Sequence, residues 1–182
     1  MEFFRTLNQD HRDFIARQPM FFVATTAAGA RINLSPKGMD SFRVLDDATV
    51  AYLDVGGSGN ETNAHLGADG RITIMFCAFA QPALIFRIYG KGVAVLPQDD
   101  RWAALLAHFT PLPGTRQIFV VAIDEVQTSC GWGVPLMTME RERTTLNKYH
   151  AATSDADRLT KWAARTTSID GLPVRVPSTT PS

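Results

Sequence analysis

The sequence has few cysteines and no excess charge of either sign. Its two cysteines, Cys77 and Cys130, form no CxxC pair, so neither a disulfide framework nor a zinc knuckle is indicated and a cytoplasmic location fits. Eighteen Lys and Arg balance eighteen Asp and Glu, so no long-range field attracts nucleic acid or an anionic membrane. The four histidines lack metal-ligand spacing, so no metal site is expected.

Long apolar runs are also missing. The longest, residues 72–80, is far shorter than the roughly 20 residues that a membrane-spanning helix needs, and the first thirteen residues lack the apolar centre of a signal peptide. Without a GxSxG elbow or a Walker loop, a hydrolase or a nucleoside triphosphatase has no motif behind it. The chain of 182 residues is 45% hydrophobic, which suits one globular domain.

The apolar pattern predicts strands joined in hairpins, with helices inserted between them. We expect helices at residues 11–18, with Asp10 as the N-cap, at 60–66, and after Pro97. The predicted strands are residues 20–26, 31–35, 49–55, 71–79, 84–96 and 117–127. About six strands in this order favour a mainly β fold, an antiparallel barrel, over a doubly wound sheet.

The C-terminal part differs from the barrel, which we assign to residues 1–135. Residues 136–175 contain a polar, helix-prone segment whose scattered apolar residues are too few to form a core. We expect this segment to be a helical arm that packs on the barrel or on a partner subunit. Residues 176–182, rich in Pro, Ser and Thr, are predicted to be disordered.

A strand-to-helix loop at residues 57–62 is the first candidate site. It contains Ser58, Gly59, Asn60, Glu61 and Thr62, and its exposed N–H groups with the positive end of a helix dipole suit a phosphate. From the residues alone, an ordinary glycine turn capped by Ser58 or Asn60 is the slightly stronger interpretation. A dinucleotide fingerprint is rejected, because Thr62 replaces the third glycine and no repeated βαβ units follow.

Two further segments are candidates for ligand contacts. Arg31, Asn33, Ser35 and Lys37 alternate, so they share one face of an extended strand, which suits either a ligand groove or a solvent-facing side. Farther on, Trp132 lies between two glycines at a strand end, where its indole could cover a flat heterocycle or close the barrel core. Cys130, near it, has no adjacent histidine or lysine that would activate a thiol, so it is not named a nucleophile.

The order of these pieces resembles the FMN-binding family related to pyridoxamine 5'-phosphate oxidase, most closely an uncharacterised branch of it. The resemblance covers nearly the whole chain, and the segments that carry it are Asn33-Leu34-Ser35-Pro36-Lys37-Gly38, Gly57-Ser58-Gly59-Asn60-Glu61-Thr62, Ser129-Cys130-Gly131-Trp132-Gly133-Val134-Pro135 and Thr167-Ser168-Ile169-Asp170-Gly171-Leu172-Pro173. It implies a six-stranded split β-barrel of Greek-key type. It also implies a homodimer with two FMN molecules between the subunits.

The resemblance also assigns roles to particular positions. It implies that Asn33, Leu34 and Ser35 line the isoalloxazine and that Lys37 reaches the phosphate. The phosphate loop falls on residues 58–62, but Glu61 and Thr62 stand where the oxidase has an arginine and lysine pair, which should weaken FMN binding. The oxidase's C-terminal substrate signature is missing as well, and this argues against vitamin B6 oxidation.

Two functions follow from these expectations. The first is an FMN-dependent oxidoreductase of unknown substrate, with NADH or NADPH as a possible electron donor, in which the cofactor supplies the reactivity and no side chain is assigned as catalytic. Trp132, from the arm or from the partner subunit, is a possible cover for the flavin. The alternative is a non-catalytic sensor or carrier of flavin or haem.

Overall fold

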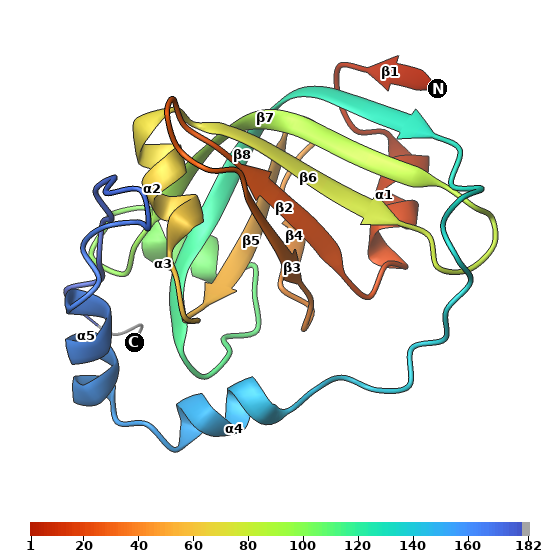
Figure 1. Cartoon of the computed structure of the whole chain (residues 1–182). Helices are drawn as coiled ribbons and strands as arrows, with labels where there is room; N and C mark the ends of the chain where they lie inside the picture. The colour runs from red at the N-terminus through yellow and green to blue at the C-terminus, as the bar shows by residue number, and fades with distance from the viewer. Residues whose placement is uncertain (180–182) are drawn as a thin grey trace.

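The computed structural model describes residues 1–179, and its strands form one antiparallel eight-stranded sheet (Figure 1). The strand order is β3-β2-β6-β7-β8-β5-β4, and β1 pairs with β8 outside this path. The strands are β1 (Glu2–Phe4), β2 (Phe21–Thr25), β3 (Asn33–Lys37), β4 (Phe42–Val44), β5 (Thr49–Val55), β6 (Arg71–Cys77), β7 (Ile85–Val95) and β8 (Thr115–Ser129).

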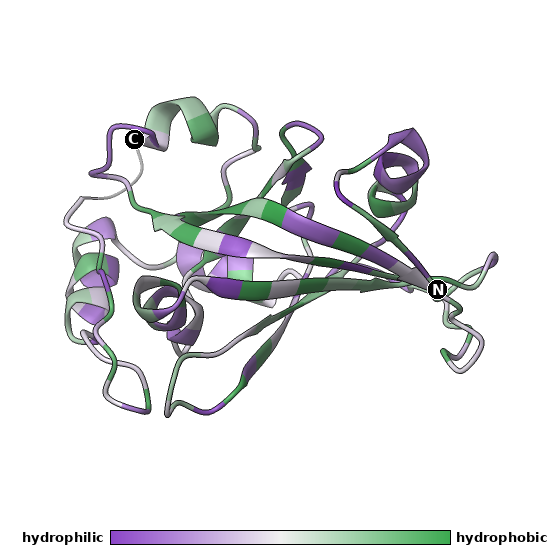
Figure 2. Cartoon of the chain, turned by 90° about the horizontal axis from the view of Figure 1, so that it is seen from above, coloured by the Kyte–Doolittle hydropathy of each residue, from purple (hydrophilic) through white to green (hydrophobic). Residues whose placement is uncertain are grey.

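The sheet curls because one face of each central strand is apolar. Val23, Ile74 and Ile88 come from three adjacent strands and are fully buried in one core, and Figure 2 shows the alternation of apolar and polar residues as bands along the strands. The two ends of the sheet meet where the Phe21 and Phe42 rings pack edge to face, 5.0 Å apart. This is the split β-barrel that the sequence predicts.

The helices occupy the ends and the outside of the barrel. They are α1 (Gln9–Ala16), α2 (Glu61–Ala68), α3 (Trp102–Leu106), α4 (Thr145–Ala151) and α5 (Asp155–Ala163). The prediction of Asp10 as the first N-cap was wrong. Asn8 caps α1 instead, because its side chain accepts from the His11 N–H while the His11 ring accepts from the Asn8 N–H, which forms a capping box.

The predicted strand count of six was too low by the two short strands β1 and β4. Each has three residues, which is too short for apolar alternation to be visible in the sequence. Strand β8 also begins earlier than predicted, because Thr115 and Arg116 continue the strand although they are polar. No helix among residues 1–179 is long and apolar enough to span a membrane.

The C-terminal region leaves β8 as a strap, which we define as residues 130–144, and then forms α4 and α5. Figure 1 shows the strap passing below the sheet, so that α4 and α5 return to the end of the barrel that carries α2. After α5, the described part of the tail predicted to be disordered contacts Gln98, whose side chain donates to the Val176 carbonyl at 3.1 Å and accepts from the Ser178 N–H at 3.3 Å. Residues 180–182 lie outside the described residues.

Gly90 should be essential for the pairing of β7 with β8. A Cβ atom at this position would lie 2.2 Å from the Ala122 carbonyl oxygen, at the point where the register of the two strands shifts. We expect Gly90→Ala to lower the free energy of unfolding by about 1–3 kcal/mol, measured by urea denaturation. Gly67→Ala is the control, because no atom lies within 4 Å of its Cβ and alanine favours a helix, so a loss of stability there would contradict the argument.

Candidate functional site

A buried carboxylate, Asp54, lies at the centre of a polar cluster at the end of β5. Lys37 Nζ lies 2.9 Å from its Oδ1, and Arg116 Nη2 lies 2.8 Å from its Oδ2. Gln117, its partner in the register of β5 and β8, donates to Oδ2 at 2.8 Å. Three strands far apart in the sequence therefore meet at one carboxylate.

The cluster carries one net positive charge, since two cations face one carboxylate. Burial alone would raise the pKa of Asp54, but the charges and hydrogen bonds of Lys37 and Arg116 outweigh burial and lower that pKa far below its ordinary value. Burial and the neighbouring Asp54 carboxylate raise the pKa of Tyr52 well above its ordinary value. Asp54 is therefore charged and Tyr52 is neutral at physiological pH.

The cluster supports the loop at residues 57–62 from beneath. Arg116 Nη1 donates to the Gly59 carbonyl at 3.1 Å, and Gln117 Nε2 donates to Asn60 Oδ1 at 2.7 Å. Asn60 is the N-cap residue of α2, but its side chain caps no N–H group of the helix, because Gln117 engages its oxygen instead. The Gly59 carbonyl and the Asn60 side chain are therefore directed toward the cluster.

The backbone N–H groups of the loop have no hydrogen-bond partner within the part of the chain that the structure describes. Among residues 1–179, no backbone N–H group from Gly57 to Asn63 has a hydrogen-bond acceptor. Gly57, Ser58 and Gly59 are exposed to solvent, and α2 begins directly after them. A run of free N–H groups at the positive end of a helix dipole is an arrangement that binds phosphate groups.

Strand β3 presents three of the predicted residues to this loop. Asn33, Ser35 and Lys37 are half-buried on one face, whereas Leu34 is 65% exposed on the other. Asn33 Nδ2 donates to Thr62 Oγ1 at 3.1 Å, and Ser35 Oγ donates to Asn33 Oδ1 at 3.3 Å. The structure thus brings the β3 face and the first turn of α2 together.

The C-terminal arm packs on the outside of the same loop. His150, on α4, lies with Nε2 2.6 Å from the Gly56 carbonyl oxygen, and the Trp162 indole packs directly over Gly56. Arg165 donates to the carbonyls of Gly57 and Ser58, and the latter bond is the shorter. Together with the cluster, the arm holds the loop carbonyls from both sides.

Glu61 and Trp132 differ from the other candidate residues. The Glu61 carboxylate accepts from the Ile169 N–H at 3.2 Å, so it is engaged with the arm. Trp132 is 87% exposed and lies beside the Gln81 to Ala83 turn, at the opposite end of the sheet from α2. Within one chain Trp132 does not reach the loop, and its role as a cover stays a prediction that requires a partner subunit.

The sequence reasoning missed the residues on which the loop depends: Asp54, Arg116, Gln117, His150 and Arg165. A signal was present for the first two, because Asp54 is a charged residue inside an otherwise apolar strand and Arg116 directly precedes the long apolar run of β8. A buried charge requires a partner of opposite sign, so Asp54 and Arg116 form a natural pair. The described residues hold no group of three or more His, Cys, Asp or Glu side chains that could bind a metal.

The fold defines a split-barrel protein, and its candidate site is a loop with free N–H groups at the start of α2. Residues 7–130 match the family described as pyridoxamine 5'-phosphate oxidase. The chain is 38% identical over 176 residues to the pyridoxamine 5'-phosphate oxidase family protein ustO of Aspergillus flavus, covering 94% of this chain and 70% of that protein. The chain belongs to the pyridoxamine 5'-phosphate oxidase family.

Solved structures agree on the fold. A candidate pyridoxamine 5'-phosphate oxidase of Lactobacillus delbrueckii is 19% identical and aligns with a TM-score of 0.56, over 68% of this chain and 95% of that one. A single-residue variant of HupZ of Group A Streptococcus is 22% identical with a TM-score of 0.55, over 67% of this chain and 98% of that one. At these identities the likeness concerns the split barrel alone.

Removal of the Asp54 charge should destabilise the protein. Asp54→Asn leaves Lys37 and Arg116 without a buried counter-ion, so we expect the free energy of unfolding to fall by about 3–5 kcal/mol in urea at pH 7. Because the pKa of Asp54 is lowered, its stabilisation is complete above its ordinary pKa of 3.8 and is lost as the pH falls below it. The variant should therefore lose less stability on acidification.

Asp124→Asn is the control, because Asp124 is exposed and makes no side-chain hydrogen bond among residues 1–179. Its stability should change by less than about 0.5 kcal/mol. Equal stability of Asp54→Asn and the native chain at pH 7 would contradict the role given to the cluster.

Gly56→Ala should release the arm from the loop. A Cβ at this position would lie 2.6 Å from Trp162 Nε1, so the indole has to move. We expect faster trypsin cleavage after Arg158 and Lys161, followed by mass spectrometry. Gly57→Ala is the matched control, because no atom lies within 4 Å of its Cβ, and equal cleavage of the two variants would disprove the contact.

Proposed function

We propose that this chain binds FMN, with the phosphate on the loop at residues 57–62 and the isoalloxazine along β3. The observation that supports this most is the run of free N–H groups from Gly57 to Asn63 above a buried cluster with one excess positive charge. Both features favour a dianion. Membership of the pyridoxamine 5'-phosphate oxidase family agrees with this ligand.

The proposed phosphate site has positive charge nearby, although Glu61 and Thr62 stand where the oxidase has two cations. Arg116 donates to the Gly59 carbonyl, and Lys37 lies beside Arg116 at Asp54, while the Glu61 carboxylate is engaged by the Ile169 N–H. Lys37 is partly exposed and is the cation with freedom to turn from Asp54 toward a phosphate. The Thr62 hydroxyl accepts from Asn33, so its own hydrogen is available to a phosphate oxygen.

The β3 face suits the ring of a flavin. Asn33 and Ser35 present amide and hydroxyl groups that can hydrogen-bond the polar edge of the isoalloxazine, and Leu34 contributes its backbone. Bound FMN supplies hydride or electron transfer. The protein orients the ring and limits water, and we assign no side chain of this chain as an acid or a base.

We further propose that the protein acts as a homodimer in the cytoplasm, as an oxidoreductase that accepts electrons from NADH or NADPH. Three large apolar side chains are mostly exposed to solvent in the single chain: Ile32 is 78%, Leu34 65% and Trp132 87% exposed. Exposed apolar groups of this size are typical of subunit interfaces, and a partner could bring Trp132 to the flavin. Both cysteines are free, which agrees with a reducing compartment.

The absorption spectrum of the protein, recorded after incubation with FMN and removal of unbound FMN by gel filtration, tests the cofactor. Anaerobic mixing with NADH or NADPH tests the activity. A flavin spectrum with rapid bleaching supports the oxidoreductase. A bound flavin that stays oxidised favours a carrier, and a Soret band after haem addition without flavin binding favours the haem alternative. Absence of flavin binding disproves the proposal.

Lys37→Gln should weaken FMN binding about tenfold or more, because it removes a charge-assisted contact to the phosphate. Quenching of flavin fluorescence gives the dissociation constant, and riboflavin, which lacks the phosphate, should bind the variant and the native chain alike. Lys91→Gln is the control, since Lys91 is exposed on β7. If both variants bind FMN equally, Lys37 has no part in the site.

A further inference from the structure

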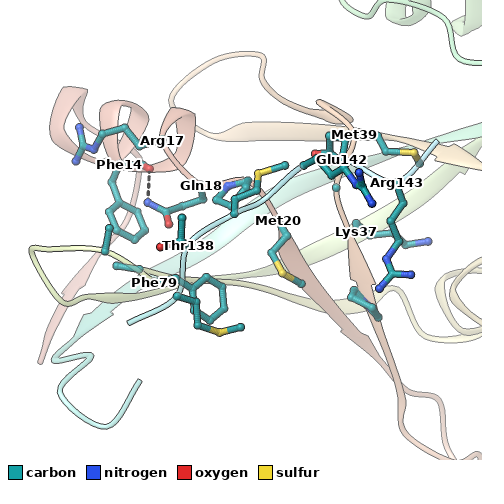
Figure 3. Close-up of a pocket in the computed structure, with 18 of the residues that line it drawn as sticks. Phe14, Arg17, Gln18, Met20, Lys37, Met39, Phe79, Thr138, Glu142 and Arg143 are labelled. Atoms are coloured by element: carbon teal, nitrogen blue, oxygen red, sulfur yellow. Dashed lines mark hydrogen bonds between the residues drawn. The ribbon is translucent and has the colours of Figure 1, made fainter. Parts of the chain in front are cut away.

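A cavity of about 1200 Å³ lies between the strap and the open side of the barrel, and neither the loop nor the β3 face before Pro36 contributes to it. It is bounded by the end of α1, the start of β2, the end of β3, the turn between β6 and β7, the strap and α4. Figure 3 shows Phe14 and Phe79 at one end, Lys37 and Arg143 at the other, and Met20 between them.

Most of the cavity wall is apolar and deformable. Four methionines line it, Met20, Met39, Met137 and Met139, and the two aromatic rings at its far end are Phe14 and Phe79. Unbranched thioether side chains adapt to ligands of irregular shape. Met39 also has a positive φ of 62°, uncommon for a residue other than glycine, and such residues cluster at ligand sites.

The opposite end of the cavity is cationic. Lys37 and Arg143 lie there with a single carboxylate, that of Glu142 (Figure 3). Arg141 also lines the cavity, and Arg17 lies at the Phe14 end with its guanidinium directed away from the other labelled side chains. Arg143 forms no ion pair among residues 1–179, and Lys37 forms its ion pair with Asp54, which lies outside the cavity. A carboxylate at this end would find charged donors that are not fully engaged.

The cavity is formed by residues of a single chain. The strap is tied to its own barrel by the Met137 N–H, which donates to the Phe79 carbonyl at 2.9 Å, and its far end is held because His150 on α4 contacts Gly56. All the segments that line the cavity belong to one chain, which suits a small-molecule site.

We propose that this cavity binds the substrate, an elongated and largely apolar molecule with one carboxylate, which lies at the Lys37 and Arg143 end. This inference rests on the proposed function, because Lys37 belongs both to the cavity and to the phosphate site. Its position places the anionic end of the substrate beside the flavin-binding face and the apolar remainder toward Phe14 and Phe79.

Titration calorimetry of the full chain with decanoate, with and without saturating FMN, tests the proposal. We expect one decanoate per chain in both conditions and binding of decanol that is about tenfold weaker, since decanol lacks the charge. Arg143→Glu should weaken decanoate binding at least about tenfold and leave decanol binding unchanged. Arg101→Glu, an exposed residue outside the cavity, is the matched control and should bind decanoate normally.

A second variant, Met139→Trp, adds bulk to the cavity from the exposed strap, so it should fold normally and bind neither decanoate nor decanol. The proposal is wrong if Met139→Trp binds decanoate as well as the native chain does. It is also wrong if the native chain does not bind decanoate, or if FMN displaces decanoate completely. If sedimentation shows that Met139→Trp is a monomer while the native chain is a dimer, the cavity is part of a subunit interface and the substrate proposal is wrong. Decanoate binding to the flavin-free chain is independent of FMN, so failure of FMN to bind disproves the cofactor without disproving the cavity.

Discussion

The ion pairs of Asp54 are the interaction on which the site depends. Its carboxylate is 2% exposed, and a charge so deeply buried is tolerated only because Lys37 and Arg116 neutralise it and Gln117 hydrogen-bonds it. Arg116 and Gln117 then extend the same network to the Gly59 carbonyl and the Asn60 side chain. One carboxylate therefore connects β3, β5 and β8 and sets the orientation of the loop before α2.

The loop is held by its carbonyls, and this leaves its N–H groups free. The cluster engages the Gly59 carbonyl from inside the barrel, and the arm engages those of Gly56, Gly57 and Ser58 from outside. Hydrogen-bond acceptors are thus consumed by the protein while donors remain for an anion. The arm, which in the sequence is only a polar helical extension, is in this way part of the site.

Much of the fold could be predicted from the sequence, because a long strand has a recognisable pattern of residue types. The aromatic and β-branched residues of β2 and β7 predict strands, and the turns between them predict hairpins and a barrel. The three-residue strands β1 and β4 are too short for such a pattern and form by pairing with β8 and β5. For the site, the alternation of Asn33, Ser35 and Lys37 correctly placed them on one face. Their partner Asp54 was missed, because local pattern carries no information on which buried charges meet.

The sequence by itself determined the elements and the local chemistry: antiparallel strands, a glycine-rich loop that begins a helix, and a strand with polar residues on one face. Only the tertiary structure decided that Lys37, Asp54 and Arg116 form one buried cluster and that the arm lies on the loop. It also decided that the strap and the barrel together line a cavity, whereas Trp132 lies far from the loop. The physical reason is that periodicity and turn chemistry act between near neighbours, while ion pairs and cavities form between segments that only the closed sheet brings together.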